Sequence, residues 1–112
     1  INWLDPKYEM TYHRMKAPYW SHFHCDRLSD WHSDEIDFVG ITFFMNDEWR
    51  YNDGGLFVWK PTWESDRGEF VEPIANRLVI NPQDYPHAVT QITNPDVKRH
   101  SIQIFIAKEY VL

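Results

Sequence analysis

Three residues whose side chains can bind a metal stand out in this sequence: His24, Asp26 two positions later, and the distant His87. Two imidazoles and one carboxylate can hold Fe(II) on one face of an octahedron and leave the other positions open for a co-substrate and O2. Residues i and i+2 of a strand point to the same side, so His24 and Asp26 can aim inward together while Cys25 points away. The three residues therefore predict a catalytic iron site ligated by His24, Asp26 and His87.

Two further polar residues, Arg99 and Ser101, follow His87 on a segment that has the composition of a strand. A guanidinium forms charge-assisted hydrogen bonds with a carboxylate, and a serine hydroxyl can add another hydrogen bond. Such a pair can bind the far carboxylate of a keto acid whose other end chelates the metal. The order of the five residues thus predicts a metal site with a carboxylate site beside it.

The sequence alone leaves other assignments of the metal ligands open. His22 shares the face of His24, so these two could form a cupin-type site with His87, although the first downstream glutamate is Glu35. A closed zinc site that includes Cys25 would require this side chain to turn inward. Each histidine taken singly is compatible with an ordinary hydrogen-bonded residue. A metal-free jelly-roll module that binds its ligand with exposed tryptophans is a further alternative.

The composition limits the size of the fold and the kinds of partner. A chain of 112 residues is expected to form one domain, and its 17% of aromatic residues supplies apolar area for a core. The net charge of −6, without any basic run, argues against nucleic acid as a partner. No apolar run is as long as a membrane span and no signal peptide is visible, so we expect no membrane partner. The single cysteine excludes an internal disulfide and fits an intracellular, cytoplasmic protein.

Short runs of alternating or β-branched residues, separated by turn signals, indicate an all-β protein with few or no helices. Many short strands of this kind are typical of a sandwich, barrel or jelly roll, in which Asp26 and His87 can face one another across the mouth. At most one short helix is expected, within residues 47–51 or around residues 29–34. The expected strands are residues 8–15, 18–26, 36–46, 56–59, 70–72, 77–81, 88–92 and 100–107.

The clearest of these strands spans residues 36–46. Apolar residues occupy both of its alternating faces, so both faces are expected to be buried. Turn signals at residues 52–55 and 94–96 separate other strands, and residues 61–68 read as a polar loop.

Motifs from about Tyr12 to Ile106 resemble the 2-oxoglutarate/Fe(II)-dependent dioxygenases of the prolyl 4-hydroxylase type. The resemblance covers most of the chain and includes the metal triad in its order. The other motifs that carry it are Ile41–Asn46, Trp49 followed by Asp53–Leu56, Glu72–Ile80, His87–Val89 and Arg99–Phe105.

The resemblance implies a double-stranded β-helix, a cupin-like jelly roll, that forms a single domain over residues 1–112 and lacks the N-terminal helices of the family. It implies a dioxygenase that couples the oxidative decarboxylation of 2-oxoglutarate to the hydroxylation of a prolyl, peptidyl or small-molecule substrate, with O2 as the oxidant. Related halogenases carry a small residue in place of the carboxylate ligand. Because Asp26 keeps that carboxylate, hydroxylation is the expected outcome.

The resemblance also implies roles for single residues. The triad would bind Fe(II) as the catalytic centre, and Arg99 and Ser101 would bind the distal carboxylate of 2-oxoglutarate. Tyr12 matches a strand tyrosine that lines the same pocket. Where relatives carry a tyrosine whose hydroxyl reaches 2-oxoglutarate, this chain has Phe44, which removes one hydrogen bond worth about 1 kcal/mol.

The substrate side of the site is less well determined by the sequence. Residues 27–35, directly after the first two ligands, are polar and are expected to form a loop that can act as a lid. Five tryptophans can either line the mouth of the site or pack in the core: Trp20, Trp31, Trp49, Trp59 and Trp63.

Overall fold

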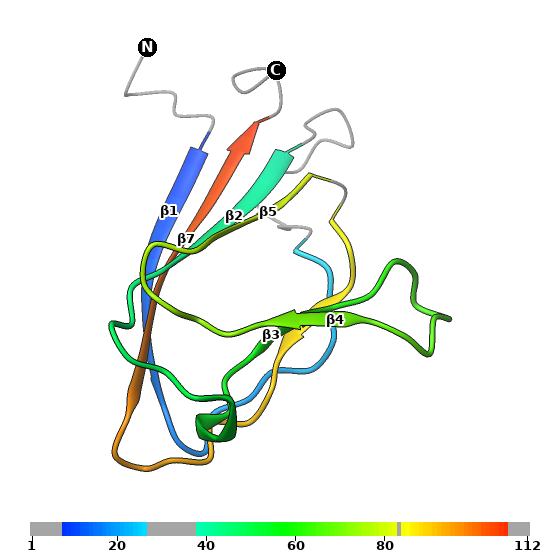
Figure 1. Cartoon of the computed structure of the whole chain (residues 1–112). Coiled ribbons are helices and arrows are strands. Elements are labelled where there is room, and N and C mark those ends of the chain that lie inside the picture. Colours follow the sequence, from blue (N-terminus) through cyan, green and yellow to red (C-terminus); the bar gives the residue numbers. More distant parts are fainter. Residues whose placement is uncertain (1–7, 27–37, 83, 108–112) are drawn as a thin grey trace.

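The computed structural model describes residues 8–26, 38–82 and 84–107 (Figure 1). Within these residues the secondary structure is almost entirely strand, and the helical part is a short 3-10 helix, η1 (Tyr51–Asp53). No helix in the described ranges is long and apolar enough to cross a membrane. The strands are β1 (Tyr8–Lys16), β2 (Phe38–Phe44), β3 (Phe57–Trp59), β4 (Glu69–Val71), β5 (Leu78–Asn81), β6 (His87–Val89) and β7 (Lys98–Ala107).

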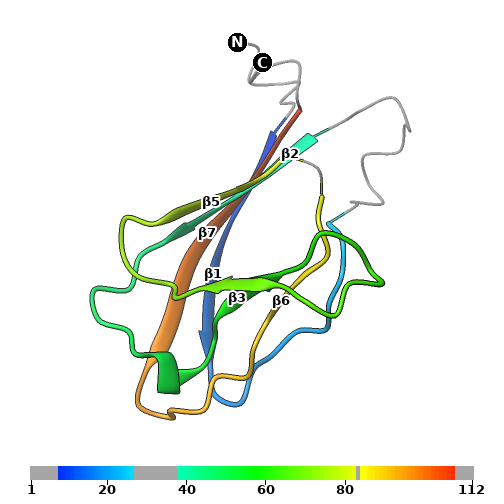
Figure 2. The ribbon, with the colours of Figure 1, turned by 45° about the vertical axis from the view of Figure 1, so that its right-hand side comes forward.

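The strands form two sheets that face each other, as the two views in Figures 1 and 2 show. The larger sheet has the order β1-β7-β2-β5, and the smaller sheet has the order β4-β3-β6. All neighbouring strands within these sheets are antiparallel. The expected all-β, jelly-roll class is confirmed.

One expected strand, residues 18–26, is wrong: the segment forms no regular strand and pairs with residues 87–92 at three separate points. Tyr19 O accepts the Ile92 N–H. Ser21 N donates to Val89 O, and His24 and His87 exchange both backbone hydrogen bonds. Between these two points the segment advances by one residue more than β6 does, so the ladder is broken as at a β-bulge. Ser21 Oγ accepts the Val89 N–H that a regular ladder would have used. The strand expected at residues 88–92 is shifted, because β6 already begins at His87 and ends at Val89.

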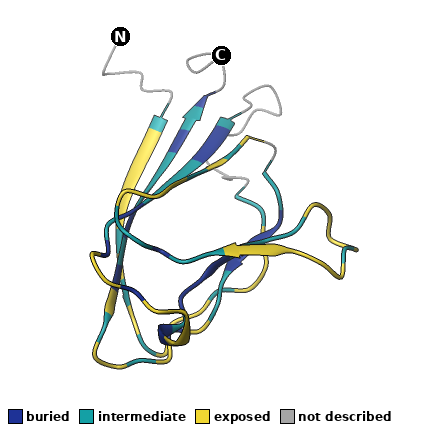
Figure 3. Cartoon of the chain, viewed as in Figure 1, coloured by how far each residue is buried: buried dark blue, intermediate teal, exposed yellow. Residues whose placement is uncertain are grey.

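The core lies between the two sheets and is built largely from aromatic side chains. Phe44 of β2 and Ile92 are fully buried, and Phe57 of β3 and Phe105 of β7 are nearly so. Phe44 and Phe57 meet across the gap with ring centroids 6.3 Å apart. Figure 3 shows buried residues on β2 and β7, the central strands of the larger sheet, and exposed residues along β1 and β4.

The expectation that both faces of residues 36–46 are buried holds only in part on the outward face of the larger sheet, where Val39 is buried but Ile41 and Phe43 are half-buried. Met10, Ile104, Ile41 and Ile80 stand directly opposite one another across its four strands. Met10 is 61% exposed and Ile80 is 56% exposed, while the two central isoleucines are half-buried. Within the described residues this face therefore presents a row of apolar side chains to solvent.

Candidate metal centre

The donor atoms of His24, Asp26 and His87 converge between the two sheets. Nε2 of His87 lies 2.9 Å from Oδ2 of Asp26, and Nε2 of His24 lies 3.3 Å from Oδ1 of the same carboxylate. One ligand atom from each residue can be chosen so that all three lie within 4.8 Å of one another. The structure thus brings together the three residues that the sequence predicts as metal ligands.

These spacings fit a single divalent ion. Adjacent ligands of an octahedral ion with bonds of about 2.1 Å lie about 3 Å apart, close to both nitrogen–oxygen distances of the cluster. Two imidazoles and a carboxylate are the donor set of the non-haem iron facial triad. His87 is buried while His24 is exposed, so the cluster is anchored on one side and accessible on the other.

Backbone carbonyls orient both imidazoles in the same way. Nδ1 of His24 lies 2.7 Å from the carbonyl oxygen of His22, and Nδ1 of His87 lies 2.7 Å from that of Tyr85. A carbonyl oxygen only accepts a hydrogen bond, so each Nδ1 is the protonated nitrogen and each Nε2 is left for the metal. Metal-binding histidines are commonly fixed through their second nitrogen in this manner.

Two backbone contacts position the ligands relative to each other. His24 N donates to His87 O and His87 N donates to His24 O, at 2.9 and 3.0 Å, so the two histidines stand side by side. The backbone N–H of Asp26 donates to Oδ1 of Asp84 at 2.6 Å. Asp84 has a φ of 51°, a left-handed conformation that aspartate tolerates better than most residues.

The larger sheet and the core close the cluster from the other sides. A Cβ atom on Gly40 of β2 would lie 3.8 Å from Oδ2 of Asp26 and 3.4 Å from the ring of Phe105, which are ordinary van der Waals distances, so β2 lies directly against the carboxylate. The ring of Phe57 is stacked on that of His87, with centroids 5.4 Å apart. Sequence reasoning missed the roles of Phe57 and Asp84, because neither residue belongs to a recognisable local motif of ligands.

The charge state of His87 follows from this environment. Burial by itself lowers the pKa of His87, but the hydrogen bond to Asp26 and the negative charge of that carboxylate raise it, as do the Tyr85 carbonyl and Asp84. The net effect is a pKa above the ordinary value of 6.5. Asp26 thus attracts a positive charge into the position where a metal ion would lie.

Arg99 is a buried cation with no acidic partner in the described part of the chain. Its side chain is 2% exposed, its Nε donates to the Gly55 carbonyl at 2.7 Å, and its guanidinium lies over the ring of Phe44 at 5.2 Å. One terminal nitrogen of the guanidinium lies 3.6 Å from the sulfur of Met15, and Tyr19 is close enough to act on the guanidinium electrostatically. Burial lowers the pKa of Arg99 to about 10, so it remains charged at neutral pH. A buried charge of this kind calls for an anionic partner.

Gly55 is required next to this arginine for two reasons. Its φ is 63°, which disfavours residues with a side chain, and a Cβ atom would lie 3.1 Å from Cδ of Arg99. Trp49, whose indole nitrogen donates to the Gly54 carbonyl, is equally close to that Cβ position. Gly55 thus allows the loop to approach the arginine closely enough for its carbonyl to accept the hydrogen bond from Nε.

Ser101 and Tyr12 lie on opposite faces of the larger sheet. Ser101 is buried and shares the inward face of β7 with Arg99, two positions earlier. Tyr12 is 54% exposed and stands opposite Ile102, so it lies on the outward face, where its hydroxyl bonds to His100. The expectation that Tyr12 lines the pocket is therefore wrong, because the register of β1 against β7 turns it away.

The alternative ligands stay outside the cluster. The ring of His22 packs edge-on against Trp20, with centroids 4.5 Å apart, and His22 contributes only its backbone carbonyl to His24. Cys25 is half-buried, and burial together with Asp84 and Asp26 raises the pKa of its thiol. The described residues thus contain the metal-binding group of His24, Asp26 and His87 without either alternative ligand.

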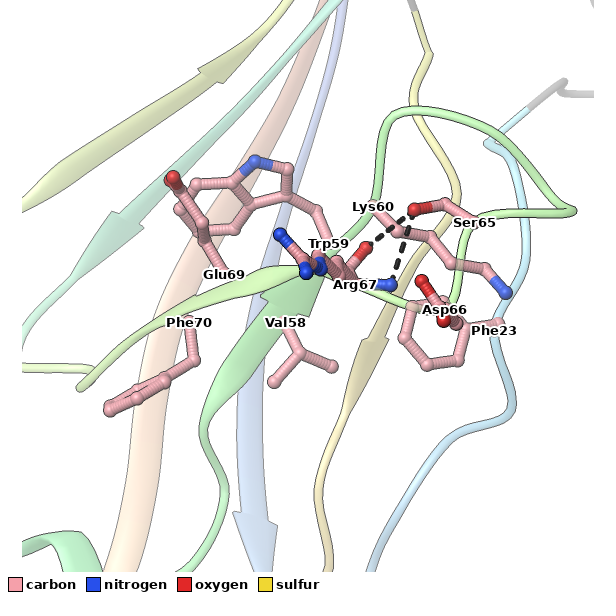
Figure 4. A pocket seen from close by; sticks show the side chains of 10 residues that line it. Phe23, Val58, Trp59, Lys60, Ser65, Asp66, Arg67, Glu69 and Phe70 are labelled. Carbon is pink, nitrogen blue, oxygen red and sulfur yellow. Dashed lines mark hydrogen bonds between the residues drawn. The ribbon is translucent and has the colours of Figure 1, made fainter.

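Among the tryptophans that the structure describes, Trp59 lies next to the metal cluster. It stands opposite His87 on one side and opposite Glu69 on the other, so the three side chains share the inward face of the smaller sheet. Figure 4 shows Trp59 and Glu69 on one side of this sheet and Val58 and Phe70 on the other. Trp59 and Glu69 also line a pocket together with Pro61, Arg67, Gly68 and Tyr85.

The remaining tryptophans divide between the core and the surface. Trp49 is buried, whereas Trp20 and Trp63 are about half exposed. Trp31 and the loop expected to act as a lid, residues 27–35, lie outside the described residues.

Comparisons with known proteins agree with this geometry. The family model of the 2OG-Fe(II) oxygenase superfamily matches residues 10–107. A crystal structure of a prolyl-4-hydroxylase from Pseudomonas putida is similar over 89% of this chain, with a TM-score of 0.71 and 22% sequence identity. The chain spans about half of that protein, 51% of its length. No curated protein sequence matches.

Proposed function

Because this chain belongs to the 2OG-Fe(II) oxygenase superfamily, we propose that it couples the oxidative decarboxylation of 2-oxoglutarate to the hydroxylation of a prolyl, peptidyl or small-molecule substrate. The observation that carries the proposal is the convergence of one carboxylate and two imidazole nitrogens within 4.8 Å. Both imidazoles have their other nitrogen bonded to a backbone carbonyl, which prepares them as metal ligands.

The residues have separate tasks in this proposal. His24, Asp26 and His87 would hold the ion, and bound Fe(II) would supply the oxygen chemistry that side chains lack. The carboxylate of Asp26 balances part of the charge of the ion, and the backbone N–H of Asp26 is held by the carboxylate of Asp84. The ring of Phe57 keeps His87 in place and excludes water from its buried side.

Arg99 supports the second half of the proposal, the use of a dicarboxylic keto acid. A guanidinium that is 2% exposed and has no described acidic partner would gain a charge-assisted pair from the distal carboxylate of 2-oxoglutarate. Ser101 on the same face would add a hydroxyl donor. Phe44 offers only its ring to this end of the site, so the binding energy would depend mainly on Arg99.

The test is the release of succinate from 2-oxoglutarate with Fe(II), in the presence of prolyl peptides, free amino acids or small metabolites. The proposal predicts turnover by the wild-type protein and its loss in Arg99→Met, which keeps an unbranched apolar side chain but removes the charge and the hydrogen-bond donors. Tyr12→Phe, on the outward face, serves as the matched control and should turn over normally. Turnover that is unaffected in Arg99→Met would favour a cupin-type metal protein. A purified protein that binds no divalent metal would favour a binding module.

A further inference from the structure

His13 of β1 lies beside Arg99 and Ser101, the two residues proposed to bind the distal carboxylate. In the register of β1 against β7, His13 lies directly opposite Ser101, and Met15 lies directly opposite Arg99. Residues directly opposite in an antiparallel pair point to the same face, with Cβ atoms about 4.5–5.5 Å apart. His13 therefore shares the inward face with Ser101 and Arg99, and Figure 2 shows the two strands side by side.

The guanidinium of Arg99 extends towards the same strand. One of its terminal nitrogens lies 3.6 Å from the sulfur of Met15, the inward residue that follows His13 on β1. On the opposite side of Arg99, the neighbour on β2 is the ring of Phe44, which has no hydrogen-bonding group. Phe44 therefore contributes no polar group here, whereas β7 and β1 both place polar side chains on this inward face.

His13 is available for such a contact. Its side chain is half-buried, and no hydrogen bond, ion pair or ring contact engages its imidazole within the described residues. A half-buried imidazole can donate a hydrogen bond from either nitrogen to a carboxylate oxygen. The inward residues flanking it on β1, Thr11 and Met15, carry no charge that would compete for the anion.

We propose that His13 is a third ligand of the carboxylate held by Arg99 and Ser101, so that this end of the site selects dicarboxylic over monocarboxylic keto acids. The inference rests on the proposed function, because it assumes that 2-oxoglutarate binds with its keto-acid end at the metal. Three donors from two neighbouring strands would surround the distal carboxylate: a guanidinium, a hydroxyl and an imidazole. A keto acid without that carboxylate would leave the donors unused.

The experiment measures binding of two keto acids to the Mn(II)-loaded protein by calorimetry, without turnover. 2-Oxoglutarate carries the distal carboxylate, and 2-oxobutyrate lacks it. His13→Leu and His13→Phe remove the donor, and His13→Gln retains one. We expect the first two variants to bind 2-oxoglutarate about tenfold more weakly or worse, in line with the loss of a hydrogen bond to a charged group. The same variants should bind 2-oxobutyrate as the wild type does, and His13→Gln should recover much of the affinity for 2-oxoglutarate.

Tyr12→Phe, the next residue on the same strand but on its outward face, controls for disturbance of β1 and should bind both acids normally. Equal weakening of both acids in His13→Leu and His13→Phe would overturn the inference, because it would indicate a purely structural role. Unchanged binding of 2-oxoglutarate in both variants would overturn it while leaving the proposed function intact. A wild-type protein that binds neither acid would instead refute the proposed function, and this inference with it.

Discussion

The carboxylate of Asp26 and the imidazole of His87 lie 2.9 Å apart, although they belong to segments far apart in the sequence. The contact exists because the backbone of His24 pairs with that of His87, which places Asp26, two residues later, over the buried histidine. Without a metal ion the pair is held by a hydrogen bond that raises the pKa of His87. A metal ion would replace the proton between them. The two residues therefore couple the pairing of two segments to the formation of the metal site.

The first prediction concerns which histidines bind the metal. His24→Ala should abolish binding of one equivalent of Mn(II) in calorimetry, because it removes one of three ligands. His22→Ala should leave the stoichiometry unchanged, since the His22 ring faces Trp20 and only its carbonyl serves the site. Loss of binding in His22→Ala as complete as in His24→Ala would assign the site to a cupin-type ligand set.

A second prediction concerns Asp84, which accepts the backbone N–H of Asp26. Asp84→Gly should weaken metal binding about 10- to 100-fold, the usual cost of losing an outer partner of a ligand. Glycine keeps the left-handed conformation, so this variant separates the lost acceptor from backbone strain. Asp84→Asn, which retains an oxygen acceptor, is the matched control and should bind the metal nearly normally. A third variant, Asp84→Ala, removes the acceptor and also disfavours the left-handed conformation. If Asp84→Ala bound the metal weakly while Asp84→Gly bound it normally, backbone strain rather than the lost hydrogen bond would be the cause.

Much of this architecture can be predicted from sequence because its signals are local. The alternation in residues 36–46 and 100–107 reveals β2 and β7, and Asn52–Gly55 marks the turn before β3. The His-x-Asp pair is also local, since two ligands on one extended segment need no information about the rest of the fold. The third ligand, His87, is far from the other two in the sequence, and only the order of the motifs identifies it as a ligand.

The face on which a residue lies is harder to predict than the strand that contains it. Tyr12 and His13 are neighbours, and a shift of one residue in register exchanges their faces. The register of β1 depends on its pairing with β7 along the whole strand, which no local pattern reveals. For this reason the family resemblance assigned Tyr12 to the pocket, whereas the register places its neighbour His13 on the inward face. The bulge between Ser21 and His24 escaped prediction for the same reason.

A third prediction concerns pH and the turn that carries Gly55. The hydrogen bond from Asn94 lowers the pKa of Asp53 below its ordinary value of 3.8, and the backbone N–H of Arg50 lowers it further. A lowered pKa in the folded state contributes stability above pH 3.8 that is lost as the pH falls through the folded-state pKa. The free energy of unfolding of the wild type should therefore decrease in that acidic range, as measured by urea denaturation.

Asp53→Asn tests the assignment. It should lower the free energy of unfolding at pH 7 by about 1–2 kcal/mol, because it weakens hydrogen bonds to a charged group. It should also flatten the decrease in stability below pH 3.8. Asp96→Asn, which removes a carboxylate from an exposed turn, is the control and should leave both quantities close to the wild type. If the free energy of unfolding of Asp53→Asn decreased below pH 3.8 as steeply as that of the wild type, other carboxylates would be responsible for the decrease.

A fourth prediction concerns the apolar row on the outward face of the larger sheet. Met10 and Ile80 lie at its two ends, 61% and 56% exposed. The double substitution Met10→Lys and Ile80→Lys should reduce binding of the dye ANS and any self-association seen in analytical ultracentrifugation, because exposed apolar patches drive both. It should change the free energy of unfolding by less than about 1 kcal/mol, since each side chain is mostly in solvent. Ile92→Ala, a fully buried residue, should by contrast cost about 2–5 kcal/mol. A loss of stability in the double variant as large as in Ile92→Ala would show that this face is packed in solution rather than free.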